Sequence, residues 1–330
     1  MFMIELLLIV NIIIALYIAF GVGANDETMA PLAGSGLITV ERIVILISIC
    51  NFIGAVLLGA KVEKTISTGI INNKVFPITL EITLIVILAE AIWLTIASTW
   101  GWPVSTTHSM VGAVLGLALF FKGFEAINLK TVSIVLLNWV ISPFIGLITA
   151  LILSKAISKF ILKRVKGLRT RESIERGSAL ILAFAAFTNS FSRAGNDVAN
   201  ASALLSTVTG EQYLIRALAA SGMVAGLLIL GRRVIRSVGL KIVELTPSSA
   251  LAAQATAAII ATVSVLLGLP LSGTHVLVAA IIGSALARKT KISLSAVKQV
   301  MFGWIVTFPV SGFLAILLTK IALYFKLIMI

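Results

Sequence analysis

Two polar segments, GWPVSTTH at 101–108 and GLPLSGTH at 268–275, share the frame G-x-P-x-S-x-T-H. Proline lacks an amide proton and glycine permits non-helical backbone, so each frame predicts a break followed by a new helix. The first amides of such a helix are unpaired, and Ser or Thr there adds a hydroxyl. Two facing helix starts would surround a small oxyanion, with candidate ligands Ser105, Thr106, Thr107, Ser272, Gly273 and Thr274. The alternative is that these residues only cap their helices.

A second pair of segments, GANDETMA at 23–30 and AGNDVANA at 194–201, carries acids between long apolar runs. A carboxylate inside a bilayer is costly unless it is paired, and such acids usually lie on ion or proton paths. We expect a broken helix at each segment that holds Na⁺ or a proton, with candidate ligands Asn25, Asp26, Asn196 and Asp197. Glu27 is a further candidate, and Arg193 is a candidate partner of the Asp197 carboxylate that the first copy lacks.

Four other titratable residues in the apolar runs have two possible roles each. His108 and His275 lie further into their helices, where a neutral imidazole bonded to a neighbouring helix competes with a proton relay or ligand contact. Glu81 and Glu90 share one apolar span, where they either pair structurally or take part in transport. Gln254 is expected to be a hydrogen bonder in helix packing.

The composition requires a membrane. Of the 330 residues 59% are apolar, mean hydropathy is +1.12, and there are 26 Lys+Arg and 13 Asp+Glu. So little charge could not cover a surface in water, which excludes a soluble enzyme, a secreted disulfide scaffold and a disordered regulator. The single Cys50 cannot form an intramolecular disulfide. The net charge of +13 does not indicate nucleic acid, because the positive residues cluster between hydrophobic runs.

A spanning helix needs about 20 apolar residues, and ten candidate segments follow along the chain. They lie near 3–22, 41–60, 77–100, 104–121, 131–162, 178–194, 213–231, 248–268, 271–287 and 299–325. The start of the chain contains no Lys or Arg in residues 1–20 and is expected to be the first span rather than a signal peptide. Residues 163–176 hold six Lys/Arg and two Glu, which places this segment in the cytoplasm.

The chain is an internal duplication. The Asn-Asp segments recur at an offset of 171 and the proline segments at an offset of 167, in the same order. The predicted organisation is a first repeat at 1–162, a cytoplasmic linker at 163–176 and a second repeat at 177–330. We therefore expect an all-α polytopic membrane protein of two repeats with broken helices or helical hairpins.

Loop charges favour inverted repeats with both termini outside, because strongly basic loops belong in the cytoplasm. The basic loops of the second half carry Arg232, Arg233, Arg236 and Lys241, then Arg288, Lys289, Lys291 and Lys298. The weaker counterparts in the first half carry Lys61, Glu63, Lys64 and Lys74, then Lys122, Glu125 and Lys130. Five crossings per half satisfy this parity, and so do three crossings plus a hairpin with the proline turn at its tip.

GNDVANA at 195–201 and the paired P-[VL]-S-x-T-H turns resemble the signatures of the inorganic phosphate transporter family, over essentially the whole chain outside the linker. The resemblance implies an inverted-repeat, sodium- or proton-coupled phosphate permease that binds phosphate between its halves, and it suggests a homodimer in the plasma membrane. The chain departs from the family at 27–29, at Arg193 and at Gly273. These departures bear on the cation stoichiometry and on a symmetrical division of ligands.

Phosphate also fits the candidate residues chemically. Hydroxyls and helix amides can donate to its oxygens, and the carboxylates of Asp26 and Asp197 can accept from a P–OH group, which sulphate lacks. The Asn–Asp pairs favour Na⁺ coupling over H⁺ coupling. The rivals are an anion channel and an intramembrane aspartyl protease that uses the two acids as a dyad.

Overall fold

The computed structural model describes residues 2–26, 28–34, 38–100, 104–161, 167–232, 235, 247–290, 292 and 294–327. Several residues singled out above lie outside this part, namely Glu27, Pro103, Arg233, Arg236, Lys241 and Lys291, together with 163–166 of the linker. The described residues form helices joined by short connections, and the one β-bridge recorded among them joins Ile71 to Ile127.

The first half contains α1 (Phe2–Ala24), α2 (Ala30–Gly34), α3 (Val40–Lys64), α4 (Leu80–Thr99), α5 (Thr106–Lys122) and α6 (Leu129–Ala156). The second half contains α7 (Leu168–Thr209), α8 (Gln212–Gly226), α10 (Pro247–Leu267), α11 (Gly273–Arg288) and α12 (Leu294–Tyr324). Single π-helical turns extend α3, α6 and α8, at Thr65–Gly69, Ile157–Ile161 and Leu227–Gly231. A helix therefore covers each of the ten predicted segments, and eight helices of the described part have the length and hydropathy to cross a membrane.

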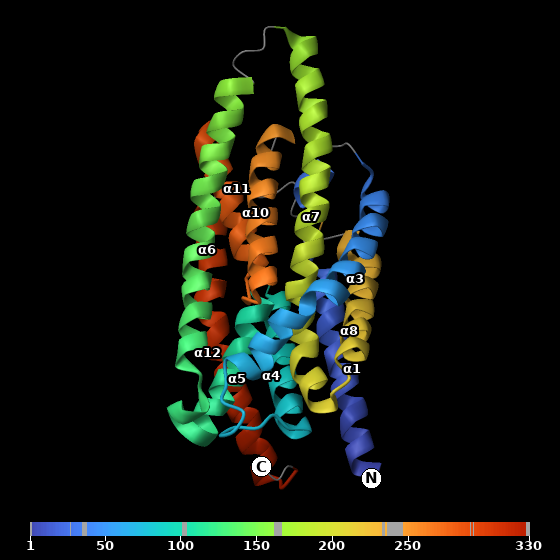
Figure 1. Ribbon diagram of the computed structural model, residues 1–330, viewed down its shortest axis with the longest axis vertical. Helices are drawn as coiled ribbons and strands as arrows, with labels where there is room; N and C mark the ends of the chain where they lie inside the picture. Colours follow the sequence, from blue (N-terminus) through green and yellow to red (C-terminus); the bar gives the residue numbers. More distant parts are fainter. Residues whose placement is uncertain are drawn as a thin grey trace.

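Residues 104–108 and 268–275 lie at the tips of two hairpins that approach each other from opposite ends of the molecule. Figure 1 shows the teal pair α4 and α5 in the lower half and the orange pair α10 and α11 in the upper half. The tips touch, since Thr107 Oγ1 donates to the Leu271 carbonyl at 3.1 Å. Of the two arrangements left open by the loop charges, the structure has the hairpins.

Each hairpin packs on the long helix of the other half, so the halves are interleaved. α5 packs along α12, and α11 packs along α6. The α5–α12 crossing is close, because a Cβ at Gly116 would lie 2.7 Å from the Gly312 Cα. Small residues that let backbones approach are the usual basis of helix association in membranes. The hairpin tips are therefore held by elements far away in the sequence.

The long helices α6 and α12 run in opposite directions. Figure 1 shows the start of α1 and the end of α12 at one end of the molecule, and the end of α6 and the start of α7 at the other. The predicted linker is described from residue 167 onward. From Leu168 onward it is the first part of α7, and Glu175 accepts hydrogen bonds from Ser248 at the start of α10.

The equivalent segments of the two halves differ at one important place. In the first half α1 ends at Ala24 and α2 begins at Ala30, so the predicted break at 25–29 is present. The prediction of a second break at 194–201 is wrong, because α7 runs unbroken from Leu168 to Thr209. The glycine of that motif allows close packing instead: a Cβ at Gly195 would lie 2.6 Å from the Leu58 Cβ on α3.

Candidate substrate and cation site

The starts of α5 and α11 meet at the hairpin tips. Ser105 caps α5, and its hydroxyl accepts from the His108 amide at 3.3 Å. Ser272 occupies the same position on α11 but makes no side-chain cap, and its buried hydroxyl has no hydrogen-bond partner among the described residues. Two positive helix ends and their hydroxyls thus lie together, as the sequence predicted.

Two amides from the middle of α7 hold the tips in place. Asn196 Nδ2 donates to the Leu271 carbonyl at 2.8 Å, and Asn196 Oδ1 accepts from the Leu271 amide at 2.8 Å. Asn200 Nδ2 donates to Thr106 Oγ1 at 2.9 Å. The Thr106 hydroxyl keeps its own proton for another acceptor, whereas Thr107 donates its proton to Leu271. Asn200 belongs to the repeated motif but was not predicted as a site residue.

Arg193 and Asp197 form an ion pair one turn apart on α7. The Arg193 Nε lies 3.0 Å from Asp197 Oδ2, and the two side chains are only 11% and 12% exposed. Asn196 Nδ2 donates to the other carboxylate oxygen at 3.0 Å. The prediction that Arg193 pairs with this acid is confirmed.

Asp26 lies in the break between α1 and α2 and has a different environment. Its carboxylate accepts from the Thr28 amide at 2.9 Å and from Asn51 Nδ2 at 3.0 Å, and the residue is 8% exposed. Ser190 of α7 donates to the side-chain oxygen of Asn51, Oδ1. Asn25 instead faces outward, where its amide bonds the Gly21 carbonyl at 3.0 Å. Asn51 and Ser190 have no counterpart of the same type in the other repeat, so sequence repetition gave no signal for them.

Thr28 and Arg193 join the two acids into one network. Arg193 Nη1 donates to Thr28 Oγ1 at 3.0 Å, and Nη2 lies 3.4 Å from Thr274 Oγ1 on α11. Gln254 Nε2 donates to the Thr28 carbonyl at 3.0 Å, a packing contact of the kind expected for it. The candidate residues of both motifs are thus brought together around the hairpin tips, and Thr28 was missed by the sequence analysis.

The two motif histidines pack against aromatic rings. The ring centroids of His108 and His275 are 4.6 Å apart, and the rings lie against Trp139 at 3.8 Å and Trp304 at 3.7 Å, respectively. The His108 ring lies beside the Trp304 backbone of α12, although no contact of the ring nitrogens has regular hydrogen-bond geometry among the described residues. The ring packing across the two tips therefore accompanies the expected contact with a neighbouring helix.

Three acids lie away from this network. Glu90 is fully buried on α4, and neither carboxyl oxygen has a hydrogen-bond partner in the described part of the chain. Glu81 lies half-buried in the first turn of the same helix. Glu63 forms a buried ion pair with Arg216 at 2.6 Å, and Ser202 donates to its other oxygen.

The assignment of Lys61, Glu63 and Lys64 to a loop is wrong. All three lie in the last turn of α3, and Lys61 Nζ donates to the Leu266 carbonyl of α10 at 2.8 Å. The positive charge of a lysine interacts favourably with the negative C-terminal end of a helix. Because Glu63 is buried, the charge of this connection comes from the exposed residues Lys61, Lys64 and Lys74.

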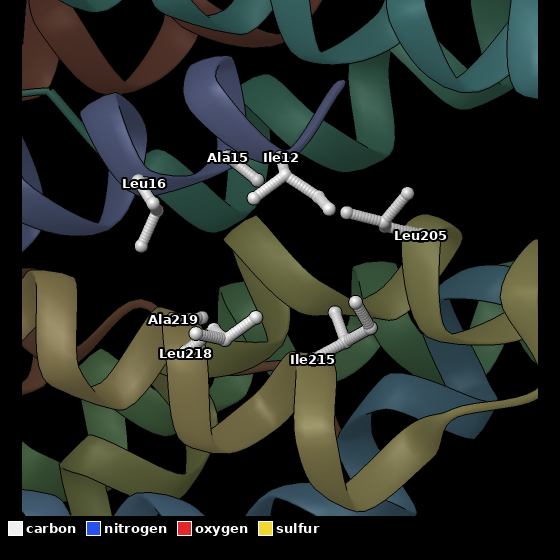
Figure 2. Close-up of a pocket in the computed structure, with 7 residues that line it drawn as sticks. All are labelled: Ile12, Ala15, Leu16, Leu205, Ile215, Leu218 and Ala219. Carbon is white, nitrogen blue, oxygen red and sulfur yellow. The ribbon is translucent and has the colours of Figure 1, made fainter. Parts of the chain in front are cut away.

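A separate shallow pocket opens between α1, α7 and α8, away from the hairpin tips (Figure 2). It is lined by Ile12, Ala15, Leu16, Leu205, Ile215, Leu218 and Ala219. This lining offers an anion no side-chain donor, so the polar network at the hairpin tips is the candidate site.

A helical bundle with two hairpins that meet tip to tip at a buried polar network is a multi-pass integral membrane transporter. The model described as the phosphate transporter family matches residues 22–315, and the chain belongs to that family. Its members are transporters, which excludes the protease alternative.

Relatives and a solved structure agree with this assignment. The chain is 30% identical to the "Putative phosphate permease" of Chlamydia pneumoniae, over 94% of this chain and 97% of the relative. It is 28% identical to the chloroplastic inorganic phosphate transporter 2-1 of Arabidopsis thaliana, over 96% of this chain and 72% of that protein. A solved structure titled the sodium-dependent phosphate transporter matches with a TM-score of 0.85 and 26% identity, and the match covers 98% of this chain and 100% of the other.

Proposed function

We propose that this protein imports inorganic phosphate by symport with Na⁺, with alternating access around the site at the hairpin tips. The observation that carries the proposal is the meeting of two helix starts, from α5 and α11, with a network that contains Asp26 and Asp197. The likeness to a sodium-dependent phosphate transporter supports the choice of cation.

Phosphate would bind at the positive ends of α5 and α11. Helix-start amides favour an oxyanion, and the hydroxyls of Thr106, Ser272 and Thr274 supply further donors. A nearby carboxylate can accept from the P–OH group. Sulphate has no such proton, so it would bring its charge against an acid without a compensating hydrogen bond.

The Na⁺ ion would bind at the break between α1 and α2. The end of a helix leaves carbonyl oxygens without intrahelical partners, and transporters use unwound segments of this kind to coordinate cations. The Asp26 carboxylate adds a negative charge that receives only neutral hydrogen bonds, from Thr28 and Asn51. Asn25 remains a candidate ligand through a rotation of its side chain.

Alternating access would follow from rocking of inverted repeats. The opposite directions of α6 and α12 and the opposed hairpins support this interpretation (Figure 1). We further propose a homodimer in the plasma membrane, on the resemblance to the family; chemical crosslinking in membranes tests the dimer.

The test is phosphate binding or uptake in proteoliposomes at several Na⁺ concentrations, with the pH gradient varied separately. Asp26→Asn should weaken phosphate binding and remove its dependence on Na⁺, because coupling between two binding sites is reciprocal. Glu172→Gln, at an acid 63% exposed on α7, is the control and should behave as wild type. If Asp26→Asn keeps its Na⁺ dependence and loses its response to pH, the Asp26 carboxylate carries a proton and does not bind Na⁺.

A further inference from the structure

We propose that the Arg193 guanidinium is a resident cation that takes the place of one co-transported Na⁺. The inference rests on the proposed sodium coupling and concerns the number of ions in each cycle. It follows from the difference between two acids, Asp26 and Asp197, that occupy equivalent positions in the duplicated sequence.

The Asp197 carboxylate is already supplied with a positive charge and with donors. Arg193 Nε binds one oxygen at 3.0 Å, and Asn196 Nδ2 binds the other at 3.0 Å. Asp197 also lies inside the continuous helix α7, where the backbone carbonyls are engaged in helical hydrogen bonds. This part of the site therefore offers a Na⁺ ion neither an uncompensated carboxylate nor free backbone oxygens.

The Asp26 carboxylate has neither feature. Its donors, the Thr28 amide and the Asn51 side chain, are both neutral, and the residue is buried. The position equivalent to Arg193 at the offset of 171 is Val22, which carries no charge. Asp26 follows the C-terminal end of α1, whose negative pole favours a cation. Of the two acids, only Asp26 therefore needs a mobile positive ion.

The guanidinium also lies where a cation would bridge Asp197 and a bound anion. A Cβ at Gly273, the first residue of α11, would come within 2.5 Å of Arg193 Nε. The position equivalent to Gly273 in the first repeat is Thr106, so the room for the guanidinium exists in one repeat only. A cation beside the positive N-terminus of a helix is unfavourable by itself. An oxyanion at that point would be attracted both to the guanidinium and to the helix N-terminus.

Among the described residues of the network, the charges then balance with one sodium ion. Arg193 and Asp197 cancel, which leaves the charge of Asp26 and that of a singly charged phosphate. The two helix starts offset about one of these charges, at about +0.5 each. One Na⁺ offsets the other, whereas loss of the guanidinium would call for a second cation.

The experiment measures the ratio of ²²Na⁺ to ³²P-phosphate taken up by proteoliposomes, together with the steepness of Na⁺ activation. Wild type should take up about one Na⁺ for each phosphate. Arg193→Gln should need a second Na⁺, with a steeper activation curve and phosphate affinity at low Na⁺ lowered about 10- to 100-fold, as expected for a lost charge-assisted contact. Arg193→Lys and the double variant Arg193→Gln/Asp197→Asn should both retain the wild-type ratio.

Each outcome of this experiment either supports or overturns the inference about Arg193. A ratio of two in wild type overturns the inference and leaves sodium coupling intact, and this measurement holds even if Arg193→Gln does not fold. A folded Arg193→Gln variant with the wild-type ratio and activation curve also overturns it. Phosphate uptake by wild type without any Na⁺ dependence would refute the sodium proposal itself, and with it a replacement of sodium by arginine.

Discussion

In the described part of the structure, the Ser272 hydroxyl at the start of α11 is buried and has no hydrogen-bond partner. Ser272→Ala should lower phosphate affinity about 10- to 100-fold, because it removes a hydrogen bond to a charged ligand. Equilibrium binding of phosphate to the purified protein measures this effect. Ser48→Ala is the control, since that buried hydroxyl bonds the Val44 carbonyl of its own helix. Wild-type affinity in the Ser272 variant would show that the turn binds no substrate through this side chain.

The ion pair of Glu63 and Arg216 joins α3 to α8 inside the protein, where both side chains are at most 5% exposed. Glu63→Ala should destabilise the protein by about 3–5 kcal/mol, because it leaves a buried guanidinium without its counter-charge. The exposed pair of Glu172 and Arg176 is the matched control, and Glu172→Ala should cost under about 1 kcal/mol. Thermal unfolding in detergent compares the two, and equal losses would contradict the argument.

Sequence reasoning identified the residues of the site that lie within the repeated motifs, together with Arg193 directly before one of them, and it missed several single polar residues. The hydroxyl turns and both acids recur at fixed offsets, which made them visible without a structure. Thr28, Asn51 and Ser190 are single polar residues without a matching residue type in the other repeat. Their contribution depends on which helices meet, and a lone polar residue in an apolar run carries no information about its partner.

At the scale of elements, helix packing explains both the close crossings and the misjudged break. Glycine in a membrane helix was taken as a sign of non-helical backbone, but Gly195 lets α3 approach α7 without interrupting the helix. The same residue type thus has two uses, and the partner helix decides between them. All ten apolar segments were predictable because hydropathy reports burial in lipid directly. The choice between a helical hairpin and two full crossings was not predictable, since both arrangements satisfy the same loop charges.

Gly116→Ala should destabilise the protein, although alanine favours helix more than glycine does. The new Cβ would lie 2.7 Å from the Gly312 Cα, and overpacking of this kind costs about 1–3 kcal/mol. Gly21→Ala is the control, because its Cβ would meet no atom within 4 Å and should be neutral or stabilising by up to about 1 kcal/mol. The unfolding temperature should fall for Gly116→Ala and stay unchanged or rise for Gly21→Ala; a stabilised Gly116 variant would argue against a tight α5–α12 crossing.

For the whole molecule, the loop charges predict which end faces the cytoplasm. Figure 1 shows the first part of α7 and the end of α12 at opposite ends. In a Cys50→Ala background, an impermeant thiol reagent added to intact cells should label Tyr324→Cys, a position 82% exposed. Glu172→Cys should react only after the cells are opened. Labelling of Glu172→Cys from outside would reverse the assigned orientation.

The interleaving of the halves has a consequence for biosynthesis. α5 packs on α12, which is made after the other described helices, whereas the partner of α11 is α6, which is made earlier. The face of α5 that carries Gly112 and Gly116 therefore stays uncovered until most of the chain has been synthesised. The second hairpin, in contrast, packs on a helix that is already present. A nascent chain that stops before α12 has both acids and both turns, yet lacks the surface that seats the α5 tip. The nascent protein should consequently become able to bind phosphate in a single late step, when α12 inserts into the membrane.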